Sequence, residues 1–218
     1  MFNTFLFDFD YTLIDASEGI VECTNYALVR NGFEPRESRP IEETVGLLLH
    51  EIFSFFEPSA SPETNRKLIN DFSEKAREVM APKTFYLPDA IPVLEELKKR
   101  GFNTAIVTSK TRQMVYDVIT PRGHEHLVNH IVGCDTVNNP KPAPDGILEC
   151  ASYFGVLLSD ILYIGDSVTD AKTAENAGVS FAGVTTGRTA KDVLKSFPNI
   201  YIGDSLTDVF SKILPPEQ

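Results

Sequence analysis

Two aspartates stand two residues apart directly after an apolar run near the start of the chain. Phe5-Leu6-Phe7 is followed by Asp8 and Asp10. Alternate residues of a strand point to the same side, so both carboxylates would project together, and like charges that close raise one pKa unless a cation intervenes. The carboxyl ends of parallel strands are also where open α/β folds bind ligands. The pair is therefore a candidate ligand site, although two aspartates alone equally well cap a turn.

Further polar side chains follow two later apolar runs or lie between them. They are small hydroxyls, carboxylates and one lysine flanked by prolines, namely Thr108, Ser109, Asp166, Asp170 and Lys141. If these strand ends converge on the aspartate pair, the clustered carboxylates need a divalent cation, and hard oxygen ligands with room for water and phosphate suit Mg²⁺. Hydroxyls, a lysine and a metal ion together are the parts that hold a phosphoryl group.

The elements that must position these residues can be recognised from short apolar runs, which are typical of buried parallel strands. They are Thr4–Phe9, Thr104–Thr108, Ile131–Gly133, Ile161–Ile164, Phe181–Val184 and Ile200–Ile202. Between them the sequence predicts helices at Ala90–Arg100, Ala143–Phe154 and Asp170–Ala177. Asp89 is the expected N-cap of the first helix, and Gly101 is placed to end it. This alternation predicts an α/β fold with right-handed crossovers.

The first strand breaks the alternation, because no second strand is predicted before Thr104. The intervening stretch has apolar residues at helical spacing in three segments, Gly19–Val29, Val45–Phe56 and Leu68–Met80, with loops at Pro35–Pro40 and Glu57–Pro62. We therefore expect a helical domain of residues 16–83 inserted into an α/β core formed by residues 1–15 and 84–218.

Composition excludes several classes of function. Asp and Glu number 31 against 20 Lys and Arg, a net charge of −11 over 218 residues. Such a field repels phosphate backbones, so nucleic acid is not an expected partner.

No apolar segment reaches the roughly 18 residues of a membrane span, and the apolar N-terminus lacks the basic residues of a signal peptide. Cys23, Cys134 and Cys150 are too few and too scattered for a disulfide framework, so we expect a cytoplasmic protein.

An eight-residue string occurs twice with little change. Tyr163–Asp170 reads YIGDSVTD and Tyr201–Asp208 reads YIGDSLTD. The first copy is followed by small residues that let a helix lie close to a sheet, and the second by an ordinary amphipathic helix. We expect the second copy to be a strand, turn and helix capped by Asp204 or Ser205, with no part in the site. The segment His124–His130 lacks metal-ligand spacing and is predicted to be a surface turn.

At this point the sequence resembles the haloacid dehalogenase-like hydrolase superfamily, and within it the phosphoglycolate phosphatase-like group. The resemblance covers most of the chain and rests on four motifs in the family's order. They are Asp8-Phe9-Asp10-Tyr11-Thr12, the hydroxyl at Thr108 or Ser109, Lys141-Pro142-Ala143-Pro144, and Gly165-Asp166-Ser167 with Asp170, Ala174 and Gly178. It implies a Rossmann-like parallel sheet with helices on both faces and an inserted all-helical cap domain.

The resemblance also implies roles. Asp8 would be the nucleophile that forms an aspartyl-phosphate, and Asp10 the general acid and base. Lys141 would hold phosphoryl oxygens together with Thr108 or Ser109; Thr108 fits the usual hydroxyl position better. Mg²⁺ would be held by Asp8, by the main-chain carbonyl of Asp10, by Asp166, and by Asp170 through water unless Asp170 instead orients the lysine.

Substrate selection is less well defined by the sequence. Thr44 and Gly46 lie where related caps place a specificity turn, and Lys110, at a strand end, is expected near substrate anions. Tyr11 departs from the family, which most often has Gly there, so its backbone must suit the turn that leaves the strand. The predicted activity is a Mg²⁺-dependent phosphatase of a small phosphorylated metabolite, as monomer or homodimer. A β-phosphoglucomutase-like phosphomutase and a non-catalytic phosphometabolite-binding protein remain as alternatives.

Overall fold

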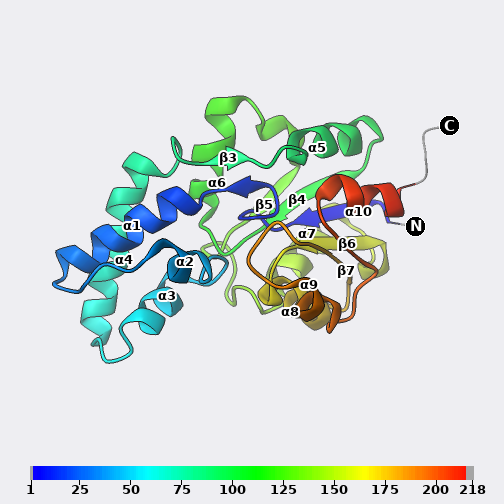
Figure 1. Ribbon diagram of the computed structural model, residues 1–218. Coiled ribbons are helices and arrows are strands. Elements are labelled where there is room, and N and C mark those ends of the chain that lie inside the picture. The colour runs from blue at the N-terminus through cyan, green and yellow to red at the C-terminus, as the bar shows by residue number, and fades with distance from the viewer. Residues whose placement is uncertain (1, 215–218) are drawn as a thin grey trace. The chain divides into compact units, whose positions relative to one another are not determined.

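The computed structural model describes residues 2–214 and divides the chain into two compact units (Figure 1). The first unit runs up to Asp15 and resumes at Tyr86, and the second is Ala16–Phe85. In the described residues no helix is both long enough and apolar enough to cross a membrane.

The first unit is built on a six-stranded parallel sheet in the order β5-β4-β1-β6-β7-β8. The strands are β1 (Thr4–Phe7), β4 (Asn103–Val107), β5 (His130–Val132), β6 (Ile161–Gly165), β7 (Ser180–Val184) and β8 (Tyr201–Gly203). All six correspond to predicted strands. In the register Phe7 lies beside Ile106 and Ile164, so the carboxyl ends of β1, β4 and β6 meet at one edge.

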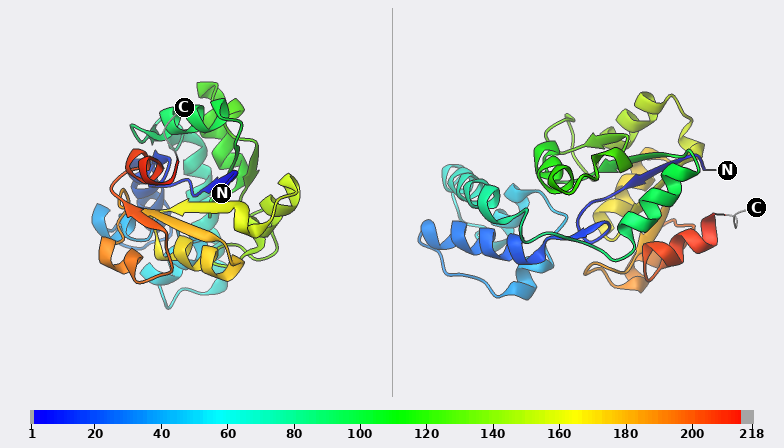
Figure 2. Two further views of the ribbon diagram at one scale, coloured as in Figure 1. Left: turned by 90° about the vertical axis from the view of Figure 1, so that its right-hand side faces the viewer. Right: turned by 90° about the horizontal axis from the view of Figure 1, so that it is seen from above.

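Helices cover both faces of this sheet (Figure 2). On one face lie α5 (Ala90–Lys99) and α10 (Leu206–Ile213), and the rings of Phe5 and Phe7 pack against Phe210. On the other face lie α7 (Asp145–Phe154) and α8 (Val168–Ala177), packed in one apolar cluster with Leu6. The predicted α/β fold with a Rossmann-like sheet is therefore confirmed.

Several local predictions need correction or extension. Asp89 is the N-cap residue of α5 as predicted, but its side chain makes no capping hydrogen bond there; its carboxylate instead accepts a hydrogen bond from Thr207 N at the start of α10. Gly101 ends α5 as predicted, with φ of 77°. The sequence analysis omitted α6 (Arg112–Ile119), α9 (Lys191–Lys195) and the 3₁₀ turns Thr120–Arg122 and Leu158–Asp160, whereas the 3₁₀ turn Glu125–Leu127 lies within the turn predicted at His124–His130.

The regular secondary structure of the second unit is helical apart from the first residue of β3. Its helices are α1 (Ser17–Arg30), α2 (Ser38–Glu42), α3 (Leu49–Phe56) and α4 (Pro62–Val79), and α1 packs along α4. Two predicted loops are partly wrong, because α2 begins inside Pro35–Pro40 and α4 begins at Pro62. Ser61 accepts a hydrogen bond from Thr64 N and proline stands at the first helical position, which together start α4 early. α3 begins later than predicted, at Leu49.

Two short strands that the sequence analysis missed mark where the chain passes between the units. β2 (Ile14–Asp15) and β3 (Phe85–Tyr86) form a two-stranded sheet. Just before β2, residues 9–14 form a tight turn in which Tyr11 N donates to Ile14 O over 2.6 Å. Tyr11 has φ of 55°, the only positive φ of a non-glycine residue in the part of the chain that is described. Tyrosine thus adopts the left-handed conformation that glycine adopts without steric cost.

Candidate active site

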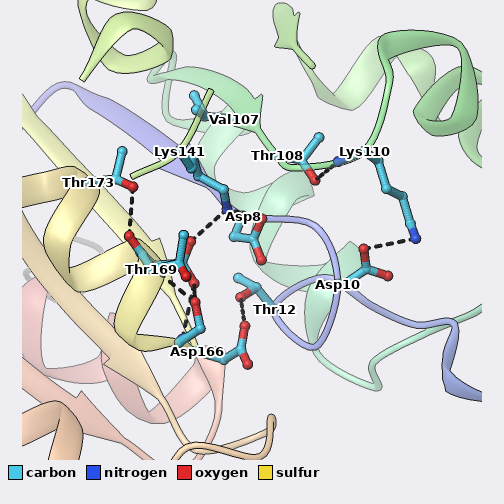
Figure 3. A network of polar contacts seen from close by, with 12 residues as sticks. Asp8, Asp10, Thr12, Val107, Thr108, Lys110, Lys141, Asp166, Thr169 and Thr173 are labelled. Atoms are coloured by element: carbon cyan, nitrogen blue, oxygen red, sulfur yellow. Dashed lines mark hydrogen bonds and ion pairs between the residues drawn. The ribbon is translucent and has the colours of Figure 1, made fainter. Parts of the chain in front are cut away.

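The aspartate pair lies at the carboxyl end of the central strand. Asp8 immediately follows β1, and its backbone N–H donates to Ile164 O of β6 over 2.8 Å. Asp8 and Asp10 are both buried, and their side chains reach different partners (Figure 3). The end of β1 thus places two buried carboxylates in the same region, Asp8 beside Lys141 and Asp10 beside Lys110.

Lys141 joins two of the predicted motifs by ion pairs. Its Nζ lies 2.6 Å from Asp8 Oδ1 and 2.7 Å from Asp170 Oδ1, with all three side chains almost fully buried. Burial by itself lowers the pKa of the Lys141 ammonium, but Asp170 and Asp8 outweigh burial and raise it. The lysine therefore stays charged, which is required of a group that holds phosphoryl oxygens.

Three buried carboxylates come together at this edge. One oxygen from each of Asp8, Asp166 and Asp170 lies within 4.8 Å of the others. Burial raises the pKa of Asp8 to about 7, with repulsion from Asp170 adding to the rise and Lys141 opposing it. Burial and then repulsion from Asp170 and Asp8 raise the pKa of Asp166 well above its ordinary value. One lysine thus leaves the cluster short of positive charge, which a bound cation would supply.

Both carboxylate oxygens of Asp170 accept hydrogen bonds from other residues of the protein. Its Oδ1 accepts from Lys141 and from the Tyr163 hydroxyl, and its Oδ2 accepts from Ser167 N at 3.0 Å and Ser167 Oγ at 2.6 Å. Ser167 in turn caps α8 by accepting from Asp170 N. Both Asp170 oxygens therefore have protein donors, an arrangement that suits orienting Lys141.

Asp10 is held differently from Asp8. Its Oδ2 lies 2.9 Å from Lys110 Nζ, and both side chains are at most 10% exposed. Its Oδ1 is buried and has no hydrogen-bond partner among the described residues. Lys110 thus lies beside one of the central carboxylates.

The predicted hydroxyls follow β4. Thr108 is buried at the strand end near Asp8, and its Oγ1 accepts a hydrogen bond from Lys110 N at 3.2 Å (Figure 3). Ser109 is half-buried. Of the two predicted hydroxyls, Thr108 is therefore the one buried at the strand end.

A loop that the sequence analysis did not single out also reaches the site. It follows β7, where Thr186 Oγ1 donates to Tyr11 O and the Arg188 guanidinium lies 5.6 Å from the centre of the Tyr11 ring. A Cβ on Gly187 would lie 1.8 Å from Asp166 Oδ2, so only glycine fits beside that carboxylate. The signal was present, since Thr-Thr-Gly-Arg follows a predicted strand at the same sheet edge.

Thr12 is a second omission, and the motif that contains it could have revealed it. Its hydroxyl donates to Asp166 Oδ1 at 3.3 Å (Figure 3). It thereby links the first motif to the last at the sheet edge.

Other predicted positions lie outside this cluster. In the helical unit Thr44 is buried with its hydroxyl donating to Ile41 O at 2.7 Å, and Gly46 has φ of 99°. Their role in specificity stays a prediction. His126 contacts Gly123 O and His130 contacts Glu149. Among the described residues, the cluster of Asp8, Asp166 and Asp170 is the only group of three or more carboxylate, histidine or cysteine side chains close enough to share an ion. The second octapeptide forms β8 and α10, capped by Ser205 as predicted.

Comparisons with known proteins agree with this geometry. The family described as haloacid dehalogenase-like hydrolase matches residues 5–184. The chain is 27% identical to a phosphoglycolate phosphatase of Nitrosococcus oceani, covering 94% of this chain and 93% of the relative. It is also 27% identical to pyrophosphatase PpaX of Bacillus cereus, covering 95% and 94%.

A solved structure is similar over nearly the whole length. It is described as a haloacid dehalogenase-like hydrolase from Bacteroides fragilis and is 33% identical, with a TM-score of 0.92 over 96% of this chain and 100% of that one. The predicted enzyme class, a hydrolase similar to phosphatases, is confirmed by these comparisons. The chain belongs to the haloacid dehalogenase-like hydrolase family.

Proposed function

We propose that this protein is a Mg²⁺-dependent phosphatase that hydrolyses a small phosphomonoester through an aspartyl-phosphate on Asp8. The observation that carries the proposal is the buried Asp8, paired with Lys141 at 2.6 Å, with the uncommitted Asp10 Oδ1 nearby. A nucleophile, a cation for the phosphoryl oxygens and a proton donor are the three groups that such a reaction needs.

In the first step an Asp8 carboxylate oxygen attacks phosphorus and the ester oxygen leaves, so the P–O bond to Asp8 forms as the ester P–O bond breaks. Asp10, through Oδ1, gives its proton to the leaving oxygen. In the second step Asp10 takes a proton from water as that water attacks the aspartyl-phosphate, and inorganic phosphate and the Asp8 carboxylate are regenerated. Lys141 and Thr108 hold the phosphoryl oxygens in both steps.

The residues present fit a magnesium ion. Asp8 and Asp166 offer oxygens within 4.8 Å of each other, and the pKa values that burial and mutual repulsion raise there support a cation in this cluster. Asp8, the main-chain carbonyl of Asp10 and Asp166 would hold the ion, and Asp170 would support it through water or orient Lys141. When bound, the ion would neutralise charge on the phosphoryl oxygens.

The leaving group is the part of the substrate that Lys110 would meet. Lys110 is 10% exposed and lies beside Asp10, the residue that would protonate the leaving oxygen. The relatives' names specify phosphoglycolate and pyrophosphate, whose leaving groups both carry negative charge. We therefore propose a small substrate with an anionic leaving group, and the helical unit with Thr44 and Gly46 as the cap that completes selection.

A panel assay of phosphate release tests this function. With Mg²⁺ we expect release from phosphoglycolate or pyrophosphate at a higher kcat/KM than from sugar phosphates of similar size, whose leaving groups are uncharged. This release should need no bisphosphate activator. Chelation should abolish release and Mg²⁺ restore it. Ca²⁺ should inhibit, because its roughly six to eight loosely arranged ligands let both Asp8 oxygens bind it and block attack.

A matched pair of variants controls this assay. Lys110→Gln should reduce the preference for anionic leaving groups, and Lys191→Gln, which removes a comparable but exposed lysine–aspartate pair, should not. Full activity in chelator would contradict the metal requirement. Release that appears only with a sugar bisphosphate would point to a phosphomutase instead.

A further inference from the structure

Tyr163 is a buried polar side chain to which the proposed function assigns no role. It lies in β6 with 0% of its surface exposed. Its hydroxyl is 3.2 Å from Lys141 Nζ and 3.0 Å from both Asp170 Oδ1 and Val107 O. Burial, and then the charge of Asp170, raise the pKa of Tyr163 well above its ordinary value, so the hydroxyl keeps its proton.

The hydrogen bonds around Lys141 can be counted. An ammonium group has three N–H donors, and three acceptors lie within reach, on Asp8, Asp170 and Tyr163. The Tyr163 hydroxyl accepts one of these bonds and donates its own proton to Val107 O or Asp170 Oδ1. In the proposed reaction Asp8 forms a bond to phosphorus, so its hydrogen bond with Lys141 changes during the reaction. Tyr163 and Asp170 are then the two hydrogen-bond partners of Lys141 that stay unchanged.

We propose that Tyr163 is a positioning residue, whose hydroxyl fixes the third N–H of Lys141 and so the direction in which the ammonium meets the phosphoryl oxygens. The proposal rests on the proposed function, in which Lys141 holds the phosphoryl group. The main-chain carbonyl of Val107 anchors the hydroxyl to β4, the strand that also ends in Thr108. Both phosphate-holding groups would then take their positions from one strand.

The second octapeptide separates this role from local structure. There the Tyr201 hydroxyl lies 3.1 Å from Asp208 Oδ1, as the Tyr163 hydroxyl lies 3.0 Å from Asp170 Oδ1, and Ser205 caps its helix as Ser167 does. The contact between tyrosine and aspartate is thus present in both copies of the octapeptide and follows from their shared strand, turn and helix. In the second copy the neighbouring lysine, Lys191, pairs with Asp204 at 2.6 Å instead. The bond from lysine to tyrosine is the feature that belongs to the first copy.

The test compares Tyr163→Phe with Tyr201→Phe, because each removes one hydroxyl from the same local structure. Tyr163→Phe should lower kcat/KM for phosphate esters roughly ten- to a hundred-fold, as expected for one hydrogen bond to a charged group. It should raise the inhibition constant of inorganic phosphate, while the Mg²⁺ concentration for half-maximal activity stays unchanged. Tyr201→Phe should leave all three quantities unchanged. General damage to the fold would raise the Mg²⁺ requirement as well, and that result would contradict the proposal.

A double-variant cycle shows whether the effect passes through the lysine. The second measurement uses Lys141→Met and an aryl phosphate whose product can be detected at low turnover. In this variant, adding Tyr163→Phe should have no further effect on kcat. Additive losses would overturn the positioning role. If Lys141→Met has wild-type activity, the proposed function fails in its use of the lysine. If Lys141→Met is inactive and Tyr163→Phe behaves as wild type, only the inference about Tyr163 fails.

Discussion

Replacement of Asp8 by asparagine is expected to abolish turnover. An amide is not a nucleophile that can accept the phosphoryl group, and the change also removes a carboxylate from the proposed metal site. After acid quench of a reaction with aryl phosphate and Mg²⁺, intact-mass measurement should show no added phosphate on Asp8→Asn. Phosphate on this variant would show that another residue is the nucleophile.

The Asp8→Asn variant should still fold. Removing one partner of a buried ion pair usually destabilises a protein by about 3–5 kcal/mol, because the other charge is left uncompensated. Here Lys141 keeps Asp170 at 2.7 Å and the Tyr163 hydroxyl. Burial and Asp170 already raise the pKa of Asp8 to about 7, so losing its charge also relieves repulsion. A thermal unfolding curve of the variant checks this, and failure to fold would contradict the charge argument.

Replacement of Asp10 by asparagine should have a large but smaller effect, because Asp8 and the carboxylate cluster remain. The loss of a general acid and base typically costs about 10²–10⁴-fold in rate. With an alkyl phosphate the full loss is expected. With an aryl phosphate, whose leaving group needs no proton, the first step should suffer less while the second still lacks its base. The phosphoenzyme should therefore accumulate and be detected by intact mass after acid quench.

A matched control for Asp10→Asn is Asp204→Asn, which also breaks an aspartate–lysine pair but on an exposed surface. The control should turn over at the wild-type rate without accumulating phosphoenzyme. Wild-type turnover of alkyl phosphates by Asp10→Asn would refute the acid–base role, as would an equal loss in the control.

The site was predictable where residue type and strand end coincide. Asp8, Thr108 and Asp166 each follow an apolar run, and parallel pairing necessarily brings such ends to one edge of the sheet. Lys141 was predictable only from its motif, because its loop follows the short strand β5. Asp10 lies two residues after Asp8 at the predicted strand end, but its contact with Lys110 depends on how the loop after β4 folds.

Features that depend on distant contacts escaped the sequence. Asp89 occupies the N-cap position of its own helix, yet its carboxylate accepts a hydrogen bond from Thr207, 118 positions away. The two-residue strands β2 and β3 are too short to show any period, and they form because separate stretches of chain meet. Tyr11 could be recognised as unusual, but its positive φ follows from the turn that the surrounding residues impose. Local pattern cannot report such contacts.

The order of the strands also determines which residues of the site separate first when the sheet unfolds locally. β1 and β6 lie inside the sheet with neighbours on both sides, whereas β5 is a three-residue edge strand paired only with β4. Amides of β5 should therefore exchange with deuterium faster than those of β1, and similar protection would contradict this view. The loop that carries Lys141 follows β5. Brief fraying of the edge would then release the lysine while the three carboxylates stay together, leaving their mutual repulsion to promote further opening.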